Sequence, residues 1–124
     1  MSSVHLENIN KSFGNINALS NLNLEIKDGE FFILLGPTGA GKTTTLRIIS
    51  GLEKPDSGKI LFNDEVVNEV QPAFRDTSYV FQQYSLYPHY SVYDNLAFPL
   101  RSPLRKSDNK QIDARVNEIA KLLK

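Results

Sequence analysis

Apolar and polar residues alternate twice near the start of the chain, over residues 4–9 and again over residues 22–27. Between these stretches, Gly14 and Asn15 form a turn signal. Alternation with a period of two predicts strands that bury one face and leave the other in solvent. We therefore expect an antiparallel β layer at the beginning of the chain.

A different pattern follows over residues 31–50. Residues 31–35 are a short continuous apolar run, which predicts a buried parallel strand. Residues 42–50 have helical spacing, with Leu46 and Ile49 on one face and Gly51 at the C-cap. The pattern thus predicts a strand, a loop and a helix in succession.

The loop between that strand and helix is rich in glycine. Its sequence is Gly36-Pro37-Thr38-Gly39-Ala40-Gly41-Lys42-Thr43-Thr44, which fits G-x-x-x-x-G-K-[ST]. Backbone N–H groups and the positive end of the following helix can surround the phosphates of a nucleoside triphosphate, because glycines keep side chains away. Lys42 can reach the outer phosphates, and the Thr43 hydroxyl can ligate Mg²⁺. A chance match would not explain the strand and helix on either side.

Two later segments offer candidates for metal or water chemistry. Residues 60–65 superficially mimic an apolar strand that ends in a metal-binding Asp, but Asp64 and Glu65 follow only three apolar residues and Asn63. We expect a hairpin tip there. Residues 78–81 read as a core strand that ends at Gln82. The carboxyl end of such a strand is where α/β proteins bind ligands, so Gln82 could face Mg²⁺ or an attacking water; an exposed loop residue fits equally well.

Aromatic residues have two readings each. Phe13, expected in the loop before the second strand, fits core packing better, and the other reading is a stacking platform for a base. The stretch from Tyr84 to Phe98 holds many tyrosines, which favours a recognition surface, and Ser91 is expected to cap a short helix within it. From Ser107 the spacing is helical to the last residue.

Composition narrows the function classes. The 124 residues allow one domain at most, and 14 basic residues balance 14 acidic ones, so no nucleic-acid partner is expected. The chain has no cysteine, which excludes disulfides and thiolate metal sites. No second His or Cys lies near His89, so an ordinary loop histidine is expected there, and the same holds for His5. Residues 31–35 are too few to span a bilayer, so membrane association would come through a partner.

These motifs together resemble the N-terminal half of an ATP-binding cassette (ABC) ATPase, over essentially the whole chain. The resemblance implies that Phe13 stacks on adenine, that Gly36 to Thr44 is the Walker A loop, and that Gln82 is the glutamine of the Q-loop. The stretch from Tyr84 to Phe98 is similar to the segment with which the family docks onto a coupling helix of the membrane-spanning subunit. The sequence of this stretch is similar to that of sugar and glycerol-phosphate importers.

The resemblance implies the following expectations. The fold class is α/β, a P-loop NTPase core with an N-terminal antiparallel β layer and the start of a helical subdomain, divided at about residues 1–83 and 84–124. ATP and Mg²⁺ are the expected cofactors, with Lys42 and Gln82 catalytic and with Thr43 and Gln82 as metal ligands. The partners would be transmembrane permease subunits and a second ATP-binding subunit. The protein would lie in the cytoplasm, peripheral to the inner face of the membrane.

Some family motifs do not occur in these 124 residues. There is no Leu-Ser-Gly-Gly-Gln signature, no Walker B aspartate with its catalytic glutamate and no switch histidine. We therefore expect the chain to be an incomplete domain with an exposed sheet edge. We expect it to bind ATP weakly and to hydrolyse little of it. One alternative is a non-hydrolysing binding module. The other, a GTPase or small-molecule kinase, is disfavoured because the Asn-Lys-x-Asp motif of GTPases is missing.

Overall fold

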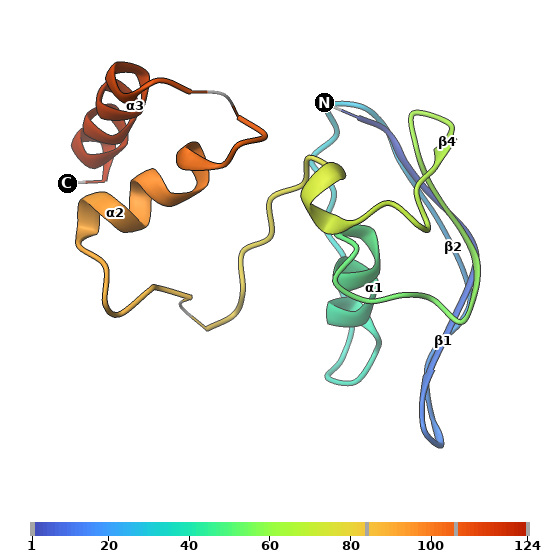
Figure 1. Ribbon diagram of the computed structural model, residues 1–124. Helices are drawn as coiled ribbons and strands as arrows, with labels where there is room; N and C mark the ends of the chain where they lie inside the picture. Colours follow the sequence, from blue (N-terminus) through green and yellow to red (C-terminus); the bar gives the residue numbers. More distant parts are fainter. Residues whose placement is uncertain (1, 84, 106, 124) are drawn as a thin grey trace. The chain divides into compact units, whose positions relative to one another are not determined.

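The computed structural model describes residues 2–83, 85–105 and 107–123 of the chain. These residues form two compact units, Met1–Val80 and Phe81–Lys124 (Figure 1). The first unit holds a β-sheet and one α-helix, and the second is helical.

The sheet of the first unit is antiparallel throughout, as the alternation predicts. Its strands, in the spatial order β2-β1-β3-β4, are β1 (Val4–Phe13), β2 (Ile16–Ile26), β3 (Ser57–Phe62) and β4 (Glu65–Val66). The turn between β3 and β4 lies at Asn63 and Asp64, both with positive φ, as tight hairpins require. This confirms the hairpin tip and leaves Asp64 at a turn rather than at the end of a core strand.

Four asparagines interrupt the pairing of β1 with β2. Asn8 and Asn21 have φ of 51° and 48°, and the register shifts beside them. Asn8 N–H donates to Asn23 Oδ1 (2.9 Å) and Asn23 Nδ2 to Asn21 O (2.9 Å). Asn21 N–H donates to Asn10 Oδ1 (2.8 Å) and Asn10 Nδ2 to Asn8 O (2.9 Å). This closed ring of hydrogen bonds, the asparagine ring, replaces the ladder bonds that the irregularity removes.

Helix α1 (Lys42–Ile49) packs against the sheet and completes the core. Its Ile48 lies with buried residues from the sheet and from the segment that follows β4: Leu6, Ile9, Leu19, Ile60 and Val67. Of the two residues expected on one apolar face, Ile49 packs against this core but Leu46 is exposed, and the fully buried positions of the helix are Thr45 and Ile48. Gly51, expected at the C-cap, follows the cap residue Ser50.

Two expected core strands do not form. Residues 31–35 and 78–81 are neither helix nor strand, and Phe31 and Val80 are 88% and 93% exposed. A parallel strand is stable only when neighbouring strands satisfy its backbone groups. In the described residues, the sheet consists of β1 to β4, so neither apolar run is one of its strands.

The second unit contains α2 (Val92–Ala97), the 3₁₀ turn η2 (Phe98–Arg101) and α3 (Asn109–Leu122). The Ser91 hydroxyl accepts from Asp94 N–H, which confirms the expected N-cap of α2. Ala97 packs against Ile112 and Val116 of α3. Tyr84, the first residue of the expected recognition stretch, lies outside the described residues. None of the helices in the described part of the chain is long and apolar enough to cross a membrane.

Candidate nucleotide site

The predicted phosphate loop, residues 36–44, leads into the N-terminus of α1 (Figure 1). Gly41 is the N-cap, and a turn closed by Ala40 N–H on Pro37 O (3.2 Å) precedes it. The first N–H groups of a helix have no partner within the helix, and they carry its positive partial charge. The loop therefore ends in a group of donors suited to an anion.

Two glycines of the loop differ in what surrounds them. A Cβ at Gly41 would lie 2.5 Å from Leu19 Cδ2 and 2.6 Å from Ala18 O, so the loop is pressed against β2 at this point. A Cβ at Gly39 would meet nothing within 4 Å. Both residues have left-handed backbones, with φ near 80° and 85°. Gly41 thus fixes the loop to the sheet, whereas Gly39 borders open space.

Lys42 closes the loop on itself. Its Nζ donates to Gly36 O and to Pro37 O, each at 2.7 Å. These bonds hold a cation over the beginning of the loop, where the outer phosphates of a nucleotide would meet it. An incoming phosphate would replace two carbonyl acceptors with a charged one, which is a stronger partner for the ammonium.

Thr43 and Thr45 have separate roles in the first turn of α1. Thr43 is exposed, so its hydroxyl is accessible to a metal ion. Thr45 is buried, and its Oγ1 donates to Gly41 O at 3.0 Å, which stabilises the start of the helix. No group of three or more His, Cys, Asp or Glu in the described residues could hold a metal by itself. The residues present fit a nucleotide that brings Mg²⁺ with its phosphates.

Phe13 is the last residue of β1 and not, as expected, part of the following loop. It pairs with Ile16 of β2 and is 47% exposed, so it is not a core residue. Leu19, which lies next to Gly41, is three residues after Ile16 in β2, and three residues of a strand span about 10 Å. Phe13 and the phosphate loop both contact β2: Phe13 pairs with Ile16, and the loop lies against Leu19.

Gln82 belongs to the second unit, where it is exposed and outside any helix or strand. The phosphate loop and Phe13 belong to the first unit. The proposed role of Gln82 toward Mg²⁺ or water therefore stays a prediction.

The sequence did not single out Arg75, which closes the other end of α1. The residue is only 7% exposed, and its guanidinium donates to Ile48 O (2.8 Å), Ile49 O (3.0 Å) and Val70 O (2.9 Å). Burial lowers the pKa of the guanidinium, which nevertheless remains a cation at neutral pH. A positive charge at the C-terminus of a helix complements the helix dipole.

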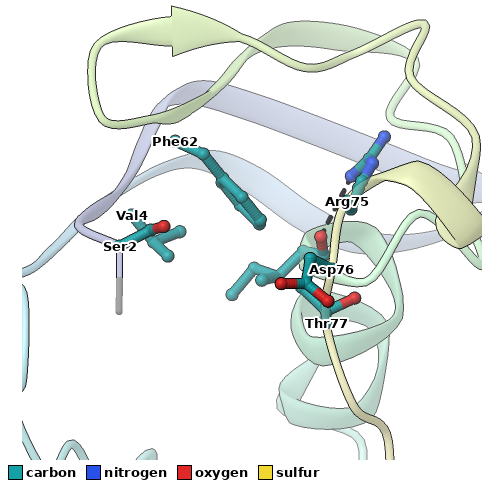
Figure 2. A pocket seen from close by; sticks show the side chains of 7 residues that line it. Ser2, Val4, Phe62, Arg75, Asp76 and Thr77 are labelled. Atoms are coloured by element: carbon teal, nitrogen blue, oxygen red, sulfur yellow. Dashed lines mark hydrogen bonds between the residues drawn. The ribbon is translucent and has the colours of Figure 1, made fainter. Parts of the chain in front are cut away.

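A hollow of about 350 Å³ lies beside Arg75. Figure 2 shows Phe62 and Val4 of the sheet on one side of it and Arg75, Asp76 and Thr77 on the other. Ile49 of α1 also lines it. This hollow is separate from the phosphate loop, because its α1 residue comes from the last turn of the helix and the loop precedes the first turn.

A family model described as ABC transporter matches residues 19–124. The chain belongs to the ABC transporter family. The match covers the phosphate loop, α1 and the entire second unit. The matched residues include the whole stretch from Gly36 to Thr44, which fits G-x-x-x-x-G-K-[ST].

Several curated members of the ABC family are similar along nearly all of this chain. The trehalose/maltose import ATP-binding protein of Thermococcus litoralis is 52% identical, over 99% of this chain and 34% of its own length. The sn-glycerol-3-phosphate import ATP-binding protein of Brucella abortus is 48% identical (99% and 35%). The spermidine/putrescine import ATP-binding protein of Fusobacterium nucleatum is 46% identical (97% and 31%). The chain spans about a third of the length of these relatives.

Solved ABC cassettes share the fold. The dimeric structure of a bacterial ABC transporter cassette matches with a TM-score of 0.80 at 32% identity, over 93% of this chain and 54% of that one. A dimeric cassette in a post-hydrolysis state, bound to ADP and phosphate, matches with a TM-score of 0.78 at 33% identity and the same coverage. These matches confirm the expected fold class, an ABC-type P-loop NTPase cassette of which this chain covers a part.

Proposed function

We propose that the chain is the nucleotide-binding part of an ATP-binding subunit of an ABC importer, which couples ATP binding and hydrolysis to solute uptake. The observation that carries the proposal is the phosphate loop: Lys42, the N-terminus of α1 and the open side of Gly39 all belong to one short stretch. ABC family membership and import-type relatives support the same function.

Each group at the site has a distinct task in this proposal. The backbone donors of residues 39–44 surround the phosphates, and Lys42 leaves the carbonyls of Gly36 and Pro37 for an outer phosphate oxygen. The Thr43 hydroxyl ligates the Mg²⁺ that comes with the nucleotide. Phe13 stacks on the base, for which its exposed ring at the end of β1 is suited. Gln82 would contribute to the metal or water.

The proposal separates binding from turnover. In this proposal, Asp64 and Glu65 at the hairpin tip are not a Walker B pair, and the 124 residues have no Leu-Ser-Gly-Gly-Gln signature sequence. Without such a pair, Mg²⁺ lacks a carboxylate ligand and the attacking water lacks its base. We therefore propose that these residues by themselves bind ATP but hydrolyse it little. The runner-up function, a non-hydrolysing nucleotide- or partner-binding module, predicts the same behaviour even in a longer chain.

The partners and location are proposals of the same kind. Membrane permease subunits would dock on the stretch from Tyr84 to Phe98, where the described residues include an exposed aromatic cluster of Tyr87, Tyr90 and Phe98. A second ATP-binding subunit is supported by the dimeric cassettes of similar fold. The protein would then lie at the cytoplasmic face of the membrane. A sugar or similar solute is proposed, although relatives of comparable identity are named for glycerol phosphate and polyamines.

Calorimetry of Mg-ATP binding to the purified 124-residue chain tests the proposal, with phosphate release followed in the same samples. Wild type should bind ATP, and Lys42→Met should weaken binding at least tenfold because the charge on the phosphates is lost. Lys59→Met, at an exposed lysine of β3, is the matched control and should bind like wild type. A folded wild-type chain that fails to bind ATP would overturn the proposal, and Lys42-dependent turnover would overturn its hydrolysis part.

A further inference from the structure

Lys11 lies near the end of β1, two residues before Phe13, and its side chain is only 12% exposed. Lysine is rarely buried to this extent unless its charge is paired. Its Nζ lies 2.8 Å from Glu53 Oε1 and 3.5 Å from Asp56 Oδ1. The hydrogen bond to Glu53 is the main cause that raises the pKa of Lys11 above its usual value, so the group stays a cation.

The same ammonium lies over the ring of Phe13, 5.0 Å from the ring centroid. A cation at this distance is attracted to the negative face of an aromatic ring. Residues two apart on a strand point to the same side, which is why the two side chains meet. Because 47% of Phe13 remains exposed, the ring still offers surface to a ligand while Lys11 covers part of it.

The two carboxylates that hold Lys11 come from the segment immediately after α1. Glu53 N–H donates to Arg47 O in the helix (3.1 Å), which ties that segment to α1. Asp56 is tied to β1 in addition, because Ser12 N–H donates to Asp56 Oδ2 (2.7 Å) and Asp56 N–H donates to Asn10 O (2.8 Å). The helix that begins at the phosphate loop is thus connected, through its far end, to the strand that carries Phe13.

We propose that Lys11 is a positioning residue for the nucleotide base: held by Glu53 and Asp56, it fixes the orientation of the Phe13 ring relative to the phosphate loop. The inference rests on the proposed function, because it requires that Phe13 stacks on the base of a bound nucleotide. Lys11 does not touch the phosphates in this scheme. Its loss therefore reduces the contribution of the base to binding and leaves the contribution of the phosphates intact.

The test compares two ligands on the 124-residue chain by calorimetry: Mg-ATP, which has a base, and Mg-tripolyphosphate, which has none. Lys11→Met keeps the aliphatic stem and removes the charge. We expect it to weaken ATP binding about three- to tenfold, the size of a partly desolvated cation–π contact, and to leave tripolyphosphate binding unchanged. Lys11→Arg should restore ATP binding to within about twofold, because a guanidinium pairs with carboxylates and stacks on rings as well.

Three further variants sharpen the comparison. Phe13→Ala should lower ATP affinity, and adding Lys11→Met to it should cause no further loss, because the lysine acts through the ring. Lys54→Met is the matched control. Lys54 lies between Glu53 and Asp56 in the sequence and pairs with Glu69 at 2.7 Å, but it is exposed. Its affinities for ATP and for tripolyphosphate should therefore equal those of wild type. A Lys11→Met chain that loses ATP and tripolyphosphate affinity equally, or neither, would overturn the inference.

A ligand-free measurement keeps the inference separate from the proposed function. Because the Lys11 ammonium lies over the Phe13 ring, the ring current should shift the Cε proton resonances next to that ammonium upfield in NMR spectra, and Phe13→Leu should abolish that shift. A wild-type chain without the shift overturns the positioning contact whether or not ATP binds. A wild-type chain that shows the shift but binds neither ligand overturns the proposed function, and with it any role of Lys11 toward a nucleotide.

Discussion

The two ends of α1 differ in exposure: the loop at its N-terminus is exposed, whereas a buried side chain bonds the carbonyls at its C-terminus. At the N-terminus, the loop around Gly39 is exposed, and the ammonium of Lys42 donates to the carbonyls of Gly36 and Pro37 within it. At the C-terminus, the carbonyl oxygens of Ile48 and Ile49 accept hydrogen bonds from the buried guanidinium of Arg75. Both ends of any helix leave backbone groups without partners. Here the protein supplies the cation at the C-terminus, and we propose that the N-terminus receives an anion from outside.

This difference shows which charges of the unit belong to its stability and which to its function. Arg75 is fixed by four backbone acceptors and is inaccessible, so we assign it to the fold. The bonds of Lys42 are short, but they lie in an exposed loop where water can replace them. Substitutions at the two ends should therefore separate unfolding free energy from nucleotide affinity.

The largest effect on stability is expected for Arg75→Met. It leaves several buried carbonyls without their charged donor, and bonds to charged groups contribute about 1.5–3 kcal/mol each, so we expect a loss of about 3 kcal/mol in the free energy of unfolding. Urea unfolding followed by circular dichroism measures this loss. Arg75→Lys keeps the charge but has fewer donors, so its free energy of unfolding should lie between those of wild type and Arg75→Met. A change below about 1 kcal/mol for Arg75→Met would show that water replaces the guanidinium.

A smaller loss is expected at the glycines of the phosphate loop, and it should be unequal. Gly41→Ala combines a left-handed backbone with contacts of 2.5 Å to Leu19 and 2.6 Å to Ala18, so about 2–3 kcal/mol should be lost. Gly39→Ala has the same backbone strain but open space, and should lose about 1 kcal/mol. Thermal and urea unfolding of both variants give the comparison. Equal losses would mean that the contact of Gly41 with β2 does not matter.

Thr45→Val tests the start of α1 with a change of nearly constant shape. It removes the bond from the buried Thr45 hydroxyl to Gly41 O (3.0 Å) and should cost about 1 kcal/mol of stability. Because the carbonyl of Gly41 also accepts from Thr45 N–H at 2.8 Å, it keeps one partner. Unfolding in urea measures the loss. Thr43→Val is the control, since Thr43 is exposed and its loss should leave stability nearly unchanged.

Lys42→Met should have the smallest effect on stability, within about 0.5 kcal/mol, because the carbonyls it leaves can turn to water. The same variant is expected to lose most of its ATP affinity. Unfolding and calorimetry on one preparation measure both quantities. If Lys42→Met destabilises the chain as much as Arg75→Met does, the contrast between the two ends of α1 is wrong.

Local patterns predicted the antiparallel layer, α1, the hairpin tip and the Ser91 cap, because each depends on residues close in sequence. The expected strands over residues 31–35 and 78–81 were wrong for the described structure, because a parallel strand depends on neighbours that a local pattern does not contain. The shift from Leu46 to Thr45 on the buried face of α1 has a similar cause. The sheet surface, not apolarity alone, decides which face of a short helix is covered.

The candidate site divides in the same way. The phosphate loop was recognisable because the chemistry of phosphate binding dictates residue types at fixed spacing. Arg75 carries no such signal, since its partners are backbone carbonyls up to 27 residues away. Lys11 could have been found from its spacing of two from Phe13 on a strand, but its carboxylate partners lie more than 40 residues further along the chain.

The asparagine ring between β1 and β2 makes the sheet sensitive to chemical ageing. Asparagine is among the thermolabile residues, and its deamidation turns an amide donor into a carboxylate. At Asn10, that change would set a negative oxygen against Asn8 O and Ser57 Oγ, both of which now accept a hydrogen bond from the amide nitrogen. The gain of a single charge would thus break the asparagine ring at the point where the strand register shifts. This point lies next to Lys11 and Phe13 in β1.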